Sequence, residues 1–175
     1  MSDYTPPYQI TDKTLSLVAL ISEKIGRITE RSNLDAKPHL RKNNKIKSIH
    51  SSLAIEANSL TLGDVKDVIN GRLVLGTEKE IQEVKNAYAA YDEVSSIDVY
   101  NINELKRVHG IMTKYVADVS VEFRHREEGL FNGDKCIFMA PPAKFVPGHM
   151  EDLFSWMKES RGKVHPLILS SVFHY

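Results

Sequence analysis

The 175-residue chain has 42% hydrophobic and 26% charged residues, which is ordinary globular usage and argues against disorder or a coiled coil. Its 23 basic and 23 acidic side chains cancel, so we expect no nucleic acid partner, because phosphate binding needs a positive field. The single cysteine excludes an internal disulfide, and without a secretory signal or an apolar run of ~18 residues we expect a cytoplasmic protein with no membrane partner.

The first part of the chain carries two helical patterns. Apolar residues between Leu15 and Ile28 recur at helical spacing and predict a helix over 11–31, whose apolar stripe needs a partner. A turn-forming segment follows, and a second amphipathic pattern predicts a helix near 38–57. Its apolar positions are Leu40, Ile46, Ile49, Leu53 and Ile55.

Three pairs of residues, each spaced like a capping box, predict further helix starts. The first opens a short helix that Asn70 and Gly71 end, the second opens a helix over about 78–94, and the third opens a helix that reaches Met112. The pairs are Thr61 with Asp64, Thr77 with Glu80, and Asn101 with Glu104. Between the last two helices, residues 95–100 form the most obvious domain seam.

The character of the chain changes at Val119. Segments rich in Phe, Val and Ile flank the turn signal Asn132-Gly133-Asp134, which predicts one exposed β-hairpin over about 119–142. Prolines then break the chain before two final helices, one over 150–159 and one from Pro166 onward. The breaking prolines are Pro141, Pro142 and Pro147.

The sequence contains no self-contained catalyst that we recognise. It has no Gly-rich phosphate loop, no Cys pair at zinc spacing and no Gly-x-Ser-x-Gly elbow. The seven His residues show no i, i+4 pairing, so no metal site is expected from them. His165-Pro166 is interpreted as a helix start, and the aromatic residues Phe145, Phe154 and Trp156 as core.

The segment IKSIHSSLAIEANSLTLGDV is the most informative. Ser52 and Glu56 lie one helical turn apart, on a helix expected to end at Asn58. Spacing alone leaves a structural interpretation open, in which Glu56 is a solvated surface carboxylate and Ser52 bonds its own backbone.

The same segment resembles the inhibitory helix of Fic family proteins, written [S/T]-x-x-x-E-[G/N], with Ala57 where the family has Gly or Asn. GRLVLGTEKEIQEVKNAYAAY is similar to the family's E-I-x-E-V-x-N helix, and NINELKRVHGIMT to the first core helix. EFRHREEGL and NGDKCIFMAPPAKFVPGHMEDLFSWM resemble the flap hairpin and the Pro-rich step after it. KVHPLILSSVFHY resembles the helix that leads into the catalytic loop.

The resemblance implies a mainly α, Fic-like helical bundle with one β-hairpin, incomplete at its C-terminus. Residues 1–98 are expected to form an N-terminal helical region with the inhibitory helix, and residues 99–175 the first part of the Fic core. It also implies a bacterial-type adenylyltransferase that moves AMP from ATP to a Ser, Thr or Tyr hydroxyl of a target protein. The catalytic loop H-P-F-x-[D/E]-G-N-G-R, which holds Mg²⁺ and the phosphates, is absent, so this chain alone is expected to be inactive, with no catalytic residue and no metal ligand.

The resemblance assigns two groups of site residues. Glu56 is expected to pair with the second Arg of the catalytic loop and deny it to the γ-phosphate of ATP, with Ser52 and Asn58 supporting it. Ile137, Phe138 and Met139 are expected to form the flap edge that aligns a target segment. Plain hairpin packing remains the alternative for these three residues.

Two rival hypotheses stay open. The chain is alternatively a non-catalytic helical regulatory or protein-binding module, or, less favoured, a helical DNA-binding protein. The last helix carries no terminating Gly, Asn or Pro, which leads us to expect a fragment of a longer protein. A homodimer is left open.

Overall fold

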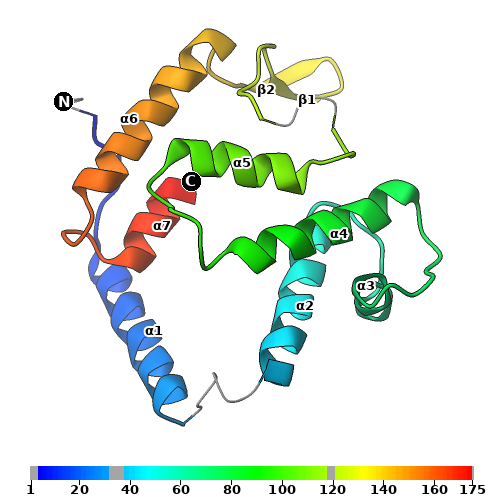
Figure 1. The fold of residues 1–175 in the computed structure, drawn as a ribbon. Coiled ribbons are helices and arrows are strands. Elements are labelled where there is room, and N and C mark those ends of the chain that lie inside the picture. The colour runs from blue at the N-terminus through cyan, green and yellow to red at the C-terminus, as the bar shows by residue number, and fades with distance from the viewer. Residues whose placement is uncertain (1–3, 32–37, 118–120, 175) are drawn as a thin grey trace. The chain divides into compact units, whose positions relative to one another are not determined.

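The computed structural model describes residues 4–31, 38–117 and 121–174, which are mainly helical and include one antiparallel two-stranded hairpin (Figure 1). This confirms the fold class predicted from the sequence. The chain divides into two compact units. The first unit contains residues 1–19, 99–102 and 122–175, and the second contains residues 20–98 and 103–121. The division at residue 98 expected from the sequence stays a prediction.

In the second unit, α2 (Pro38–Ile55), α3 (Leu62–Ile69) and α4 (Glu78–Glu93) share one hydrophobic core. Ile49, Val65 and Val84, one from each helix, are its most fully buried side chains. The other buried members are Ile46, Leu53, Leu60, Val68 and Ala87. The apolar faces predicted for these three helices therefore form the core, because each helix buries the stripe that its sequence spacing defines.

Ile55 is an exception to the predicted apolar face of α2. Its side chain is 83% exposed, whereas Ile49 and Leu53 of the same helix are buried. Residues two apart on an α-helix point about 200° apart around the axis, so Ile55 faces away from the core that Leu53 enters. The prediction that Ile55 belongs to this face is wrong.

α1 (Asp12–Arg31) begins one residue after the predicted start. Its apolar stripe is exposed, with Leu15 at 63% exposure and Ile28 at 54%, so the expected partner is not found among the described residues. Within residues 4–31, 38–117 and 121–174, no helix combines the length and apolar character that a bilayer crossing requires. α5 (Ile102–Met112) begins directly after Asn101, as predicted.

In the first unit, α6 (Val146–Glu159) and α7 (Pro166–His174) build a second core around Phe154, Trp156 and Leu169. Phe154 meets the Phe173 ring edge to face at a centroid distance of 5.3 Å. The Tyr8 ring packs on Trp156 in the same way at 5.8 Å. Two of the three aromatic residues expected in the core are thus confirmed.

Phe145, the third of these aromatics, is 49% exposed and is not a core residue. It ends a short 3₁₀ turn, Ala143–Phe145, and occupies the position directly before α6, where its side chain makes no capping hydrogen bond. α6 also begins at Val146 rather than at Met150, so Pro147 lies in its first turn instead of breaking the chain. Pro is tolerated there because an N–H of the first turn has no helical acceptor.

The hairpin consists of β1 (Gly129–Asn132) and β2 (Lys135–Met139). Its two-residue turn begins at Gly133, whose φ of +59° suits a hairpin turn that follows the strand twist. Every residue of both strands is exposed. The strands are shorter than the predicted hairpin of about 119–142, since residues 121–128 are not strand and residues 118–120 lie outside the described part.

We predict that Ile49→Ala lowers the free energy of unfolding by about 2–5 kcal/mol, because it leaves a cavity at a site with no solvent exposure. Ile55→Ala makes the same chemical change on the same helix at an exposed position and is expected to stay within about 0.5 kcal/mol. Urea unfolding followed by far-UV circular dichroism measures both. Equal losses in the two variants would contradict this assignment of the core.

Candidate functional site

The end of α2 is a Schellman-type turn built on an alanine. The N–H of Ala57 donates to the Ala54 carbonyl at 3.2 Å, and the N–H of Asn58 donates to the Leu53 carbonyl at 3.0 Å. Ala57 has a φ of +64°, in the left-handed region where Gly or Asn is usual. The helix therefore ends in a left-handed turn although the residue is Ala, at a conformational cost of about 1–2 kcal/mol.

Asn58 holds this turn in place through hydrogen bonds of its buried side chain. Its side chain is buried, and its Nδ2 donates to the Glu80 carbonyl at 3.2 Å and to Glu83 Oε2 at 2.9 Å. Its Oδ1 accepts the N–H of Leu60 at 3.1 Å. The residue predicted at the helix end thus ties the chain beyond α2 to α4.

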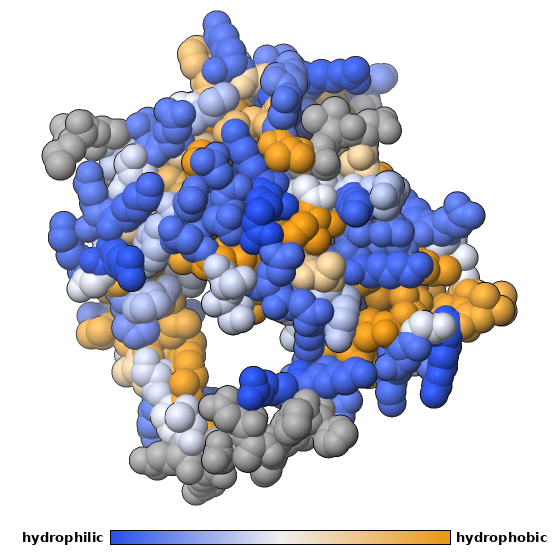
Figure 2. Space-filling view, viewed as in Figure 1, coloured by the Kyte–Doolittle hydropathy of each residue, from blue (hydrophilic) through white to orange (hydrophobic). Residues whose placement is uncertain are grey.

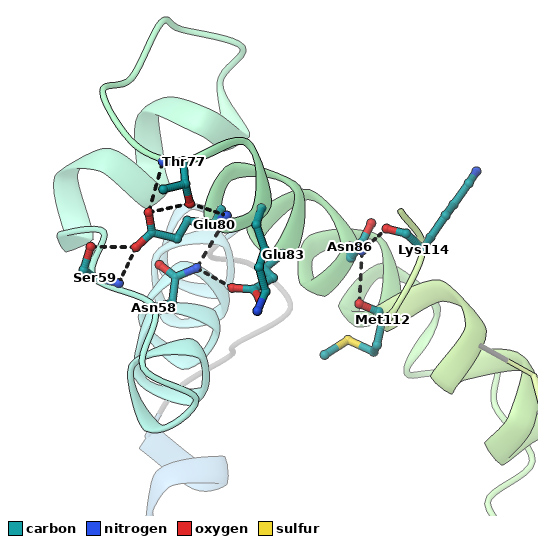
Figure 3. Close-up of polar contacts among 9 residues, drawn as sticks. Asn58, Ser59, Thr77, Glu80, Glu83, Asn86, Met112 and Lys114 are labelled. Atoms are coloured by element: carbon teal, nitrogen blue, oxygen red, sulfur yellow. Dashed lines mark hydrogen bonds and ion pairs between the residues drawn. The ribbon is translucent and has the colours of Figure 1, made fainter. Parts of the chain in front are cut away.

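The Glu80 carboxylate joins two segments (Figure 3). Oε1 accepts the N–H and hydroxyl of Ser59 at 2.9 and 2.6 Å. Oε2 accepts the N–H and hydroxyl of Thr77 at 3.0 and 2.8 Å, which is the capping box predicted for α4. One side chain therefore caps α4 and holds the segment that leaves α2.

These hydrogen bonds favour the charged form of Glu80. The Ser59 hydroxyl and N–H, followed by the Thr77 N–H and hydroxyl, lower the pKa of Glu80 from its ordinary 4.5 to about 2. Because the folded-state pKa lies below the unfolded value, the stabilisation is complete above pH 4.5 and is lost as the pH falls towards about 2.

Asn86 extends the same polar face of α4 towards α5. Its side chain is buried, and its Nδ2 donates to the carbonyls of Met112 and Lys114 at 3.0 and 2.7 Å (Figure 3). Its Oδ1 accepts from Gln82 Nε2 at 2.8 Å. Asn86 thereby satisfies carbonyls at the C-terminal end of α5 that have no helical donor.

Glu56 and Ser52 both point to solvent. Ser52 lies in the last turns of α2 and Glu56 in the turn that follows it, and both residues are exposed. We find no hydrogen bond or ion pair from either side chain to another described residue. The structure therefore does not join the two, and it leaves the Glu56 carboxylate available on a turn whose neighbours are fixed.

The three residues expected to form the flap edge lie together on β2. Ile137, Phe138 and Met139 are 54–60% exposed, and Phe138 lies opposite Leu130 in the register. The irregularity between Leu130 and Phe131 leaves Ile137 without a partner on β1, so the strand is locally bulged. Packing against a core does not account for these side chains.

The remaining candidates are His165-Pro166 and the side chains that could bind a metal ion. α7 begins at Pro166, and the N–H of Leu167 donates to His165 Nδ1 at 3.2 Å, so His165-Pro166 is a helix start as predicted. In the part of the chain that the structure describes, no three His, Cys, Asp or Glu side chains gather to hold a metal ion.

The described fold matches a solved structure closely. A crystal structure of a Fic family protein from Desulfovibrio desulfuricans G20 superposes with a TM-score of 0.90 at 42% sequence identity. The match covers 98% of this chain. The chain therefore has a Fic fold. It spans about half of that relative, 52% of its length, and no family model matches the sequence.

Within this Fic fold, the polar residues of EIQEVKN have a role that the sequence did not predict. Glu80, Glu83 and Asn86 lie three residues apart along one side of α4. Glu80 binds Ser59 in the segment after α2, Glu83 binds Asn58, and Asn86 binds the carbonyls at the end of α5. The regular spacing was a usable signal of one polar face, but their partners are distant in sequence and left no local pattern.

We predict that Ala57→Gly raises the free energy of unfolding by about 0.5–1 kcal/mol. Glycine relieves about 1–2 kcal/mol of left-handed strain but gains unfolded-state entropy. The matched control is Ala54→Gly, an exposed position inside α2, which should lose about 1 kcal/mol. Urea unfolding of both variants checks the opposite signs, and destabilisation by Ala57→Gly would contradict the strained turn.

We predict that Glu80→Gln destabilises the fold at neutral pH, because an amide oxygen cannot replace both acceptor oxygens. The difference from the wild type should shrink as the pH falls from 4.5 towards about 2, where Glu80 itself becomes protonated. Urea midpoints measured across this range test the window. Glu78→Gln, in the same helical turn, should show a much smaller change. An equal loss of stability in the two variants would contradict the role assigned to Glu80.

Proposed function

We propose that this chain is part of a Fic-type protein adenylyltransferase, which transfers AMP from ATP to a Ser, Thr or Tyr hydroxyl of a target protein. The observation that carries the proposal is the match to a Fic family protein at 42% identity over 98% of this chain. The chemistry belongs to the whole enzyme, and this chain contributes the regulatory and target-aligning side.

We assign the regulatory role to Glu56. Its carboxylate is exposed and has no partner among the described residues, so a cation from another segment can reach it. Its position is nevertheless constrained, because Ala57 holds the turn and Asn58 is buried and bound to α4. Because the backbone at this turn is already fixed, only the Glu56 side chain loses conformational entropy when it binds an arginine.

The inhibition proposed is a competition for one arginine. Glu56 pairs with an arginine that would otherwise bind the γ-phosphate, so ATP binds in an unproductive pose. A charge-assisted pair of this kind is worth about 1.5–3 kcal/mol, which corresponds to about tenfold or more in rate. Ser52, one turn before Glu56, is proposed to orient the carboxylate once the pair has formed.

The hairpin is proposed to align the target. Ile137, Phe138 and Met139 offer exposed apolar side chains along β2, and within the described residues β2 pairs only with β1. An extended target segment laid beside its other edge would make main-chain hydrogen bonds and place alternate side chains on these residues.

The nucleotide and Mg²⁺ are assigned to the whole enzyme and not to this chain. The described residues offer no cluster of three carboxylate, His or Cys side chains to hold a metal ion. They therefore do not fit an Mg²⁺ site by themselves, and no step of the proposal passes through a metal held by them.

To test the proposal, the complete gene product is incubated with ATP and Mg²⁺, and the intact mass of the proteins in the reaction is followed over time. The wild type is expected to gain the mass of AMP slowly, on itself or on an added lysate protein. Glu56→Gln should raise the rate by about tenfold or more, because the amide no longer attracts the arginine.

The control is Glu151→Gln, which removes one exposed carboxylate from α6 and should leave the rate unchanged. An unchanged rate in Glu56→Gln, with a measurable wild-type rate, would reject the inhibitory role alone. Absence of AMP transfer in every variant would instead favour a non-catalytic regulatory or protein-binding module.

A further inference from the structure

We infer that Ser59 and Glu80 are positioning residues for Glu56. Their hydrogen bonds keep the strained turn at Ala57 closed, and the closed turn keeps the end of α2, with Glu56, in one place. The inference rests on the inhibitory role proposed for Glu56. It adds that the strength of inhibition depends on a contact with α4 and not on Glu56 alone.

The left-handed turn at Ala57 is favoured neither by its own residue nor by its backbone hydrogen bonds. A non-glycine residue at a φ of +64° is disfavoured about 5- to 30-fold in population relative to a right-handed helix. The N–H groups of Ala57 and Asn58 donate to the carbonyls of Ala54 and Leu53. A continued α-helix would give these two N–H groups the same two acceptors in exchanged order, so the bonds do not select the turn. Contacts from outside the turn therefore hold it.

Two acidic side chains of α4 supply these contacts (Figure 3). Glu80 Oε1 accepts the N–H and the hydroxyl of Ser59 at 2.9 and 2.6 Å. Glu83 Oε2 accepts Nδ2 of the buried Asn58 at 2.9 Å. A longer α2 would carry Asn58 and Ser59 around its axis and break both contacts. Both contacts therefore favour the turn over further helix.

Glu80 is a strong acceptor that is already in place. Its Oε2 accepts the N–H and the hydroxyl of Thr77 at 3.0 and 2.8 Å, so the carboxylate is ordered independently of Ser59. The donors of Ser59, followed by those of Thr77, lower the pKa of Glu80 to about 2. The carboxylate is therefore ionised at neutral pH, and hydrogen bonds to an ionised acceptor are stronger than neutral ones.

Among the described residues, packing does little to hold the last turn of α2. Leu53 is the last residue of α2 in the hydrophobic core. Ala54, Ile55 and Glu56 are all exposed, and Ile55 is 83% exposed. Helix ends with few buried contacts open locally at little cost. The order of this turn thus depends on the chain that follows it, through the tie of Ser59 to α4.

The tie bears on inhibition because an ordered carboxylate binds an arginine at a lower entropy cost. When the contact between Ser59 and Glu80 is broken, the strain at Ala57 favours opening of the turn. Pairing of Glu56 with an arginine then has to order the backbone of the turn as well as the side chain. The pair becomes weaker, and the arginine is free more often to bind the γ-phosphate.

Ser59→Asp in the complete gene product tests the inference by the rate of AMP transfer. The new carboxylate faces that of Glu80 and repels it, so the rate should rise about threefold or more, up to the level of Glu56→Gln. Ser59→Ala removes one hydrogen bond and should give a smaller rise. Ser95→Asp adds the same charge at an exposed serine after α4 and should leave the rate unchanged. Circular dichroism checks that each variant is folded.

Two double variants separate positioning from a general effect on the fold. In the Glu56→Gln background, Ser59→Asp should raise the rate no further, because it acts through Glu56. In the Ala57→Gly background, its effect should be smaller, because glycine adopts the left-handed turn without strain and ends the helix by itself.

Amide hydrogen exchange of the 175-residue chain, followed by NMR, measures the turn directly and does not depend on activity. In Ser59→Asp, the N–H groups of Ala57 and Asn58 should exchange about threefold faster or more, since their hydrogen bonds open with the turn. The N–H of the buried Ala87, inside α4, should keep its exchange rate.

Four outcomes would overturn this inference alone, provided that Glu56→Gln raises the rate of transfer. They are an unchanged rate in both Ser59 variants, an undiminished rise in the Glu56→Gln background, an equal rise in the Ala57→Gly background, and unchanged exchange at Ala57 and Asn58. Absence of AMP transfer in every variant, Glu56→Gln included, would instead reject the proposed function and this inference with it.

Discussion

The Glu80 carboxylate is the constraint on which the second unit depends. Four hydrogen bonds converge on it, two from Ser59 and two from Thr77. It is therefore at once the cap of α4 and the clamp on the chain that leaves α2. Because all four donors are satisfied by one ionised group, the end of one helix and the start of another have a single relative position.

This clamp explains how an exposed carboxylate can have a defined place. Ser59 and Asn58 are both bound to α4, and only the turn at Ala57 separates them from Glu56. The chain thus goes from a buried anchor to a solvent-facing acid within two residues. Such an arrangement suits a group that must meet a partner arriving from elsewhere, because its backbone is fixed while its side chain is unpaired.

The two units expose apolar side chains in different ways. The hairpin of the first unit has its own strand partner and offers exposed side chains on β2. The segment 73–76 of the second unit has no backbone partner among the described residues and is supported by Val74 on the core. The first is a paired strand with one edge free, and the second is a connection without regular secondary structure whose two leucines are exposed. Figure 2 shows hydrophobic surface over α3 and over the connection from α3 to α4.

Local signals were enough to place the helices and the hairpin. Capping boxes at Thr61 and Thr77, the Gly133 turn and the Pro166 start act over a few residues, so the sequence by itself determined the fold class and most boundaries. It failed at Pro147, where helix entry and helix breaking use the same residue, and at Phe145 and Ile55, where periodicity does not say which face meets the core.

Only the tertiary structure decided which polar groups meet. The pairing of Ser59 with Glu80, the burial of Asn58 and the binding of Asn86 to the end of α5 join residues more than twenty positions apart. These features follow from long-range packing, which leaves no periodic trace in the residues that take part.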